Sequence, residues 1–311
     1  MAMNALRFHE FGEPADVLRL EQAEILEPGP DRIRVRVHAC GLNPADWALC
    51  RGLFPGTLPR GVGLEVSGTV DAVGEGVTDV SVGDQVLGAA DYAAGHGAGA
   101  AEFTMMNHWA RIPAGLDPIQ AAALPLAVET ANRSIDGLGI SAEHTLLVNG
   151  AGTMIGFAAV QIGLIRGARV LATSGETYAE RLRELGATVT AYGEGMAERV
   201  LEAAGGPVDR VLDTAPPNGA LPDLVKIAGG DPRRVLTISD MAAAAGLGVR
   251  TSFDEDQPRK LYYDLLAEYA QRAADGTFTV PIARTFPLAD WRAALETSLS
   301  GRAGGKLILL P

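Results

Sequence analysis

A turn of small residues is the first segment whose residue types and spacing could do chemistry, and it reads Asn149-Gly150-Ala151-Gly152-Thr153-Met154-Ile155-Gly156. The apolar stretch before it is typical of a buried strand, and a helical pattern follows it. Unpaired amides and the dipole at the start of that helix would bind a pyrophosphate. Gly150 and Gly152 would let the backbone approach the phosphates, and Gly156 would let the helix pack close to the strand. The pattern departs from strict GxGxxG, but in this context it predicts a dinucleotide cofactor.

The end of the next strand, predicted over Arg169–Thr173, decides between NADPH and NADH. A carboxylate there would repel the 2′-phosphate of NADPH, and Glu176 has the spacing from the glycine turn expected of such an acid. We expect Glu176 to lie in the turn beyond the strand, where it need not face the ribose. Ser174, Tyr178 and Arg181 could instead bind the phosphate, although Arg181 also fits a solvated helix face. The sequence therefore favours NADPH.

Strand-like and helix-like segments alternate through the middle of the chain. The predicted strands are Thr145–Val148, Arg169–Thr173, Thr188–Tyr192, Val208–Asp213, Arg234–Ile238 and Gly248–Phe253. The predicted helices are Ala121–Leu138, capped by Asp117, then Ile155–Arg166, Tyr178–Leu185, Met196–Ala204 and Leu221–Ala228. Such alternation implies right-handed crossovers and a parallel sheet covered on both faces. The fold class is therefore α/β, with a doubly wound nucleotide-binding domain.

The two ends of the chain have a different pattern. Met1–Ala123 reads as mainly β, beginning with the clean polar and apolar alternation of Asp31–Cys40. At the other end, predicted helices at Arg259–Ala274 and Leu288–Ser300 precede a short apolar strand, Gly305–Leu310. Because a lone strand is not stable by itself, we expect this last strand to join the N-terminal β part.

Composition limits the function classes. The 311-residue chain has a formal net charge of −12, which repels phosphate backbones and argues against a nucleic-acid partner. No apolar run reaches the roughly 18 residues of a membrane-spanning helix. Two cysteines, Cys40 and Cys50, make neither a disulfide framework nor a cysteine-rich metal cluster. We expect a cytoplasmic protein with no membrane partner.

Short motifs spread over nearly the whole chain carry a family resemblance. They are Cys40–Trp47 (CGLNPADW), Gly63–Gly68 (GLEVSG), Val82–Val86 (VGDQV), Ala121–Pro125 (AAALP), Thr130-Ala131, Leu185–Ala187 (LGA) and Gly304–Lys306 (GGK). In this order they resemble the medium-chain dehydrogenase/reductase superfamily, in its zinc-independent quinone oxidoreductase, or zeta-crystallin-like, branch. The resemblance implies a GroES-like, mainly β catalytic domain at 1–123 plus 268–311. It also implies a Rossmann NADPH-binding domain at 124–267.

The resemblance implies that both zinc sites of the superfamily are absent. Zinc alcohol dehydrogenases place a ligand cysteine where this chain has Asn43, and a Gly-His-Glu segment where it reads Gly63-Leu64-Glu65. Catalytic zinc needs about three N, S or O ligands. Asn43 and Leu64 cannot supply them, and the four clustered cysteines of the structural site are missing.

Further site residues are assigned by the resemblance alone. Asn43 would border the nicotinamide and contact the cofactor or donate to the acceptor oxygen, with a turn-forming asparagine as the alternative. Thr130 would meet the nicotinamide side of the cofactor. Lys306 would close the cofactor cleft from the C-terminal strand, unless it is a solvated lysine. The residues over the pyrophosphate would be Thr153, Met154 and Ile155.

The proton donor is the least determined part of the predicted site. Many members of this branch carry a tyrosine where this chain has Ala48. Tyr92 and His96, in the glycine-rich stretch Gly88–Gly99, are the nearest substitutes, because a neutral phenol can donate and histidine titrates near working pH. A plain surface loop, with protonation by bulk water, is the alternative.

The resemblance implies an NADPH-dependent reductase that passes hydride to a quinone or an α,β-unsaturated carbonyl. Without zinc, an isolated ketone has nothing to stabilise its developing alkoxide, whereas a conjugated acceptor spreads the charge. An enoyl-thioester reductase and a non-catalytic NADPH-binding protein are the alternatives. The family also suggests a homodimer in which the strand near Gly248–Phe253 pairs with its twin.

Overall fold

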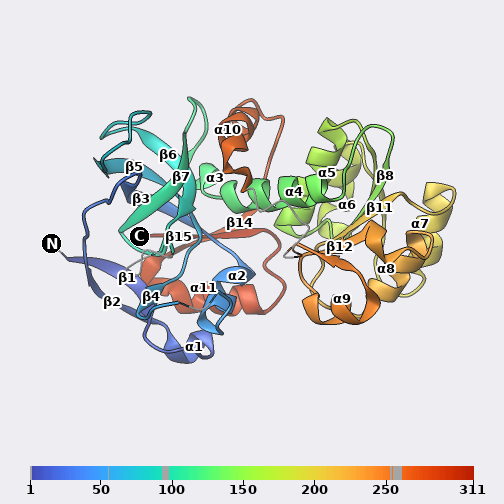
Figure 1. Cartoon of the computed structure of the whole chain (residues 1–311), viewed down its shortest axis with the longest axis horizontal. Coiled ribbons are helices and arrows are strands. Elements are labelled where there is room, and N and C mark those ends of the chain that lie inside the picture. The colour runs from blue at the N-terminus through green and yellow to red at the C-terminus, as the bar shows by residue number, and fades with distance from the viewer. Residues whose placement is uncertain (1, 55, 93–97, 253, 255–260) are drawn as a thin grey trace. The chain divides into compact units, whose positions relative to one another are not determined.

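The computed structural model of the chain describes residues 2–54, 56–92, 98–252, 254 and 261–311 (Figure 1). The chain divides into two compact units, Met1–Leu126 with Tyr263–Pro311, and Ala127–Tyr262. We call them the β unit and the nucleotide unit. None of the helices in the described ranges combines the length and the apolar character that a bilayer crossing requires.

A sheet built around β3 (Ile33–Leu42) organises the β unit. β3, β5 (Glu65–Val73), β6 (Gln85–Ala90) and β7 (Phe103–Arg111) pair in this order, and β7 also pairs with β3. The four strands therefore close on themselves, which leaves fewer open sheet edges. Ile33 and Val35 are fully buried, so the predicted alternation of β3 is confirmed.

The last strand of the chain returns to this sheet, as predicted. β15 (Lys306–Leu310) runs antiparallel to β3, with Leu307 opposite Leu42, and parallel to β14 (Ile282–Pro287). This pairing brings the start of β15 beside the end of β3. Two residues 263 positions apart in the sequence, Asn43 and Lys306, become neighbours in this way.

Short elements complete the β unit. A three-stranded sheet contains β1 (Ala2–Phe8), β2 (Arg19–Glu24) and β4 (Arg60–Gly61). The helical elements are α1 (Pro14–Val17), α2 (Pro44–Cys50), α3 (Pro118–Ala121), α10 (Leu266–Ala274), η3 (Leu288–Asp290) and α11 (Trp291–Leu299), and η2 (Tyr262–Leu265) precedes α10.

Helix α2 was not expected, because seven residues are too few to show helical periodicity. The residues at the N-terminus of the helix specify it instead. The Asp46 side chain accepts a hydrogen bond from the backbone N–H of the N-cap residue, Asn43, and Pro44 occupies the first turn, where a missing N–H costs nothing.

The helix predicted over Ala121–Leu138 is in fact two helices. α3 begins after the predicted cap, Asp117, whose side chain accepts hydrogen bonds from Ile119 N and Gln120 N. α4 (Pro125–Gly137) starts afresh at Pro125, since proline cannot continue a helix from the preceding turn.

The nucleotide unit contains the predicted doubly wound sheet. Its six strands are all parallel in the order β10-β9-β8-β11-β12-β13. They are β8 (Thr145–Asn149), β9 (Arg169–Thr173), β10 (Thr188–Thr190), β11 (Arg210–Asp213), β12 (Val235–Thr237) and β13 (Arg250–Thr251). The order reverses between β8 and β11, where sheets of this kind bind ligands at their carboxyl edge.

Helices cover both faces of this sheet (Figure 1). They are α5 (Met154–Ile165), α6 (Glu176–Glu184), α7 (Met196–Ala204), α8 (Leu221–Ile227) and α9 (Met241–Leu247), with η1 (Pro232–Arg234) before β12. Leu147 and Leu171 pack with α7, α8 and α9 on one face. Gly163 of α5 lies against Val170 and Leu146 on the other.

Several elements in this unit differ from the prediction. The strands predicted to reach Tyr192 and to begin at Gly248 are shorter, because β10 ends at Thr190 and β13 begins at Arg250. The alanine-rich segment was not predicted to be helical, but it forms α9, capped by the side chain of Asp240. Glu176 is the first residue of α6, not a turn residue.

Candidate active site

Two glycines shape the turn between β8 and α5. Gly150 has a φ of +79°, and a Cβ atom on it would lie 2.5 Å from the backbone nitrogen of Ala215. A Cβ on Gly156 would lie 2.4 Å from the carbonyl oxygen of Gly150. Both the left-handed conformation and the close approach of α5 to the turn therefore need glycine.

The start of α5 presents free backbone donors. Thr153 is the N-cap, and its Oγ1 accepts a hydrogen bond of 3.0 Å from Gly156 N. Within the described ranges, the N–H groups of Gly152, Met154 and Ile155 have no hydrogen-bond partner. Three unpaired donors at the positive end of a twelve-residue helix have the chemistry to hold an anion. The geometry fits the pyrophosphate of a dinucleotide.

A buried ladder of polar side chains holds this turn, and sequence analysis missed it. Its four residues end four neighbouring parallel strands: Thr173 ends β9, Asn149 ends β8, Asp213 ends β11 and Thr237 ends β12. Thr173 Oγ1 donates to Asn149 Oδ1 at 2.6 Å, and Asn149 Nδ2 donates to Asp213 Oδ1 at 2.8 Å. Thr237 Oγ1 donates to Asp213 Oδ2 at 2.8 Å. A polar residue at the end of each apolar strand is the sequence feature that could have predicted this ladder.

The ladder connects directly to the turn. Gly150 N donates to Thr173 Oγ1 at 3.0 Å, so the first glycine is fixed from the neighbouring strand. Asp213 is 4 % exposed, and burial raises its pKa in spite of the hydrogen bonds that it accepts. A fully connected polar network of this kind rigidifies the edge of the sheet.

The residues predicted for the 2′-phosphate lie around the start of α6. Ser174 is buried and its Oγ donates to Gly175 O at 2.9 Å. Tyr178 packs on Phe157 of α5 with ring centroids 5.4 Å apart, and burial raises the pKa of its phenol. The Arg181 guanidinium lies 5.5 Å from the same Phe157 ring. Tyr178 and Arg181 are therefore held beside the first turns of α5.

Two further side chains in this region, Glu176 and Tyr192, would affect the binding of a 2′-phosphate. Glu176 is exposed in the first turn of α6. Tyr192 is 62 % exposed, and its ring lies 3.4 Å from the position of a Cβ on Gly175. Tyr192 was not singled out from the sequence, because it was assigned to a strand; an exposed tyrosine next to the cap of α6 is the feature that identifies it.

Thr130 lies on α4 and is 8 % exposed. Its Oγ1 donates to Glu129 Oε2 at 3.0 Å, and Glu129 forms an ion pair of 2.7 Å with Arg133. The hydroxyl is thus fixed on a buried carboxylate within its own helix.

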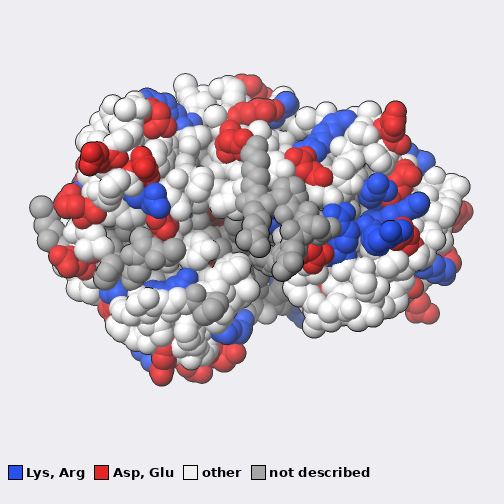
Figure 2. All heavy atoms as spheres, in the orientation of Figure 1, with Lys and Arg blue, Asp and Glu red and all other residues white. Residues whose placement is uncertain are grey.

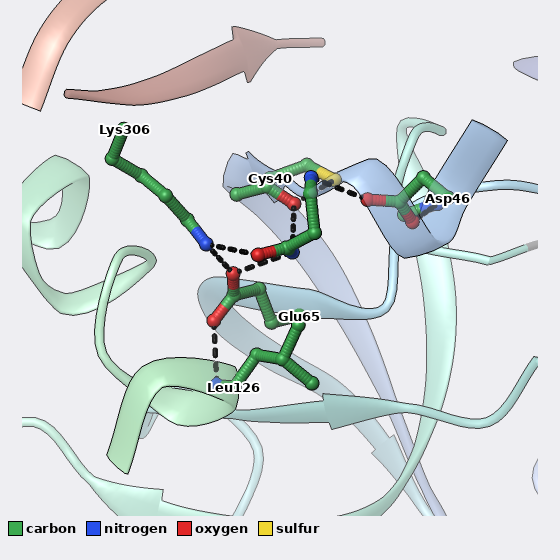
Figure 3. A network of polar contacts seen from close by, with 8 residues as sticks. Cys40, Asp46, Glu65, Leu126 and Lys306 are labelled. Atoms are coloured by element: carbon green, nitrogen blue, oxygen red, sulfur yellow. Dashed lines mark hydrogen bonds and ion pairs between the residues drawn. The ribbon is translucent and has the colours of Figure 1, made fainter. Parts of the chain in front are cut away.

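In the β unit, Asn43 and Lys306 meet in a buried quartet with Glu65 and Asp46 (Figure 3). Lys306 Nζ donates to Asn43 Oδ1 at 2.5 Å and forms an ion pair with Glu65 Oε1. Asn43 Nδ2 donates to the same Glu65 oxygen at 2.8 Å, and Glu65 Oε2 accepts from Leu126 N at 2.7 Å. The side chains of Lys306 and Glu65 are 2 % and 1 % exposed. The quartet joins the ends of β3, β5 and β15 to the start of α4.

Asp46, the fourth member of the quartet, holds two backbone segments together. Its Oδ2 accepts from Asn43 N at 2.7 Å and its Oδ1 accepts from Gly63 N at 2.8 Å. Burial raises the pKa of Asp46 from 3.8 to about 6, opposed by these two backbone hydrogen bonds.

This raised pKa predicts a characteristic pH dependence of stability. A carboxyl whose pKa is higher in the folded state contributes stability below pH 4, and that contribution is lost as the pH rises through 6. The difference in unfolding free energy, wild type minus Asp46→Asn, should fall by about 2 kcal/mol between pH 4 and pH 7. Denaturant unfolding at several pH values measures it. Asp231→Asn should give the opposite sign, because Arg233 lowers the pKa of Asp231; a pH-independent difference for Asp46→Asn would contradict the assignment.

The remaining candidates lie elsewhere. Tyr92 is half-buried, with the Arg60 guanidinium 5.7 Å from its ring. His96 lies outside the described residues. Burial raises the pKa of the Cys50 thiol to about 12 and that of the Cys40 thiol well above its usual range, so neither sulfur is a nucleophile at neutral pH.

The donors around Glu65 do not fit a zinc ion. One carboxylate oxygen is bound by the Lys306 ammonium and the Asn43 amide, and the other by Leu126 N. Leu64 offers no lone pair, and a buried ammonium repels a dication. In the part of the chain that the structure describes, no group of three or more His, Cys, Asp or Glu residues could hold a metal ion.

Two family models match the chain. Residues 29–114 match the model described as "Alcohol dehydrogenase GroES-like domain", which lies within the β unit. Residues 185–309 match the model described as "Zinc-binding dehydrogenase".

Individual relatives agree with these matches. The quinone oxidoreductase-like protein 2 homolog of Nematostella vectensis is 30 % identical over 98 % of this chain and 88 % of its own length. The quinone oxidoreductase of Rattus norvegicus is 34 % identical over 187 residues, so this chain covers only 55 % of that protein. Among solved structures, an alcohol dehydrogenase superfamily protein from Novosphingobium aromaticivorans is 27 % identical, with a TM-score of 0.81 over 100 % of both chains. The chain belongs to the medium-chain dehydrogenase/reductase superfamily, in its quinone oxidoreductase branch, as its motifs predicted.

Proposed function

We propose that this chain is a zinc-independent, NADPH-dependent reductase that transfers hydride to a quinone or an α,β-unsaturated carbonyl. The observation that carries the proposal is the turn after β8. Its three unpaired N–H groups, on Gly152, Met154 and Ile155, lie at the switch point of a doubly wound sheet, where they would bind a pyrophosphate. The names of the relatives support the same reaction class.

The side chains near α6 support NADPH over NADH. A 2′-phosphate needs positive charge and hydrogen-bond donors. Arg181 supplies the charge, and Tyr178 and Tyr192 supply phenol O–H donors. Glu176 opposes the phosphate from the first turn of α6, but it is exposed and therefore screened by solvent.

Replacing Arg181 tests this choice of cofactor. Arg181→Ala should lower kcat/KM for NADPH by about tenfold and leave kcat/KM for NADH unchanged, because a charge-assisted contact to the 2′-phosphate is lost. Arg183→Ala, an exposed arginine on the same helix, is the matched control and should change neither. If Arg181→Ala affects both cofactors equally, or if the wild type prefers NADH, then Glu176 controls the ribose site.

The chemical class of the hydride acceptor is inferred from the charged side chains of the β unit. Bound NADPH supplies a hydride, and the developing negative charge on the acceptor must then be stabilised. The Lys306 ammonium is committed to Glu65 and Asn43, and the donors around Glu65 do not fit zinc, so neither group of the quartet that the structure describes supplies strong electrophilic stabilisation. A quinone or enone delocalises the charge into its own π-system, and a proton completes the hydroquinone or ketone. We expect turnover with quinones and enones and none with an isolated ketone.

Single residues near the reacting groups would have separate roles in the chemistry. Asn43 and Thr130 would border the nicotinamide, and Lys306 would act by orienting Asn43, since its ammonium binds Asn43 Oδ1. Tyr92 and His96 are the candidate proton donors. Replacement of either donor should lower kcat with little change in KM for NADPH, provided that it protonates the acceptor.

A homodimer in the cytoplasm is part of the same proposal. β13 lies at the edge of the six-stranded sheet, and pairing with its twin would cover that edge. Sedimentation of the purified chain would test the dimer, and a monomeric mass at micromolar concentration would contradict it.

A further inference from the structure

A groove lined by arginines lies on the nucleotide unit, away from the glycine turn. Its volume is about 440 Å³, within the range of small-molecule sites. Four of its lining residues are Arg210, Arg233, Arg234 and Arg250, and Asp136 and Asp231 also line it. Figure 2 shows Lys and Arg atoms gathered on the nucleotide unit in the region where Figure 1 draws β11 and β12.

The topology separates this groove from the cofactor turn. Arg210 is the first residue of β11, Arg250 is the first residue of β13, and η1 ends directly before β12. The groove therefore lies at the amino edge of the parallel sheet. The glycine turn follows the last residue of β8, at the carboxyl edge.

The two acids of the groove already have partners. Asp136 forms an ion pair with Arg166. Asp231 accepts from Arg233 Nε at 3.0 Å and from Arg233 Nη2 at 3.1 Å. After these pairings Arg210, Arg234 and Arg250 give the groove an excess of positive charge, although the chain as a whole has a net charge of −12. The local positive charge is therefore not a consequence of the overall composition.

Structural roles account for some of the arginines but not for all. Arg210 Nε donates to Leu138 O at 2.9 Å and thereby holds the end of α4. Arg234 approaches Asp231 only at 3.9 Å. Arg250 is half-buried and, among the residues that the structure describes, has no hydrogen bond or ion pair. The Arg250 guanidinium is therefore available to pair with a ligand that enters the groove.

We propose that this groove binds a small polyanion, a molecule that carries two or more phosphate or carboxylate groups. Each guanidinium can pair with one oxyanion through two parallel hydrogen bonds, so Arg250 and Arg234 match two separate anionic groups. Arg210, the first residue of β11, adds a further positive charge to the groove. Phosphate esters and polycarboxylates share this chemistry.

Titration calorimetry on the purified full chain tests the proposal, with inorganic pyrophosphate and citrate as the two probes. We expect the wild type to bind at least one probe, more weakly at higher salt. Arg250→Glu should weaken that binding by about tenfold or more. Arg19→Glu, an exposed arginine in the β unit, makes the same charge change outside the groove and should leave the affinity within about twofold. Tighter binding of pyrophosphate would identify a phosphate ligand, and tighter binding of citrate a carboxylate ligand.

Pyrophosphate could also bind at the glycine turn, and saturating NADPH separates the two sites. If binding persists with NADPH present and is lost in Arg250→Glu, the groove is the site. If NADPH abolishes the binding, if Arg250→Glu and Arg19→Glu behave alike, or if the wild type binds neither probe, the proposal is wrong. Should Arg250→Glu fail to fold, the neutral pair Arg234→Gln and Arg250→Gln serves as the second variant. None of these outcomes depends on the reductase activity.

Discussion

Gly150→Ala should raise the Kd for NADPH by about a hundredfold or more. The residue has a φ of +79°, a conformation that costs other L-residues about 1–2 kcal/mol. The new Cβ would also lie 2.5 Å from the backbone nitrogen of Ala215, so the turn must move. Movement displaces the free N–H groups of Gly152, Met154 and Ile155 together, and each bond from such a donor to a phosphate is worth about 1.5–3 kcal/mol. Fluorescence titration with NADPH measures the loss.

A glycine elsewhere in the same unit provides the control. Gly246→Ala places a methyl group on α9 with no atom within 4 Å, so NADPH affinity should stay unchanged. The far-UV circular dichroism of both variants shows whether the sheet is intact. Wild-type affinity in a folded Gly150→Ala would contradict the assignment of the turn as the pyrophosphate site.

Lys306→Met should destabilise the β unit by about 3–5 kcal/mol. The Glu65 side chain is 1 % exposed, and without Lys306 its charge stays buried with Asn43 and Leu126 N as the remaining partners among the described residues. The chain's three tryptophans, Trp47, Trp109 and Trp291, all lie in the β unit, so their fluorescence in a urea titration reports on this unit.

Lys226→Met is the matched control, because it breaks a lysine–glutamate pair at the surface. Lys226 and Glu198 are 2.9 Å apart with side chains 57 % and 68 % exposed, and solvent screening leaves such surface pairs with little effect on stability. Adding Glu65→Gln to Lys306→Met should recover part of the lost stability, since no charge is then buried. Equal effects of Lys306→Met and Lys226→Met would show that the quartet does not hold the β unit together.

Local patterns predicted the elements well where the pattern was long. The alternation along β3 and the apolar strand before the glycine turn both predicted the observed structure, because burial of one face dictates residue type over many positions. The short helices α2 and α9 were not predicted from the sequence. Their helical state depends on the caps at Asn43 and Asp240 and not on periodicity.

The candidate site could be predicted only in part. The turn at Gly150 is local, so its residues stand together in the sequence. The quartet is not local, since Asn43 and Lys306 meet only because β15 pairs with β3. The resemblance placed both residues at the cofactor, but it did not reveal that Glu65 holds them. Similarly, Tyr192 lies near the candidate site only because its ring is beside Gly175 in the folded chain.

The central claim is tested most directly by following NADPH oxidation by the purified, chelator-treated chain with a quinone as acceptor. We predict quinone-dependent loss of the reduced nicotinamide absorbance, faster with NADPH than with NADH and unchanged by chelation. Absence of turnover with quinones and enones in spite of tight NADPH binding, or loss of activity on chelation that zinc restores, would contradict the proposed zinc-independent reductase.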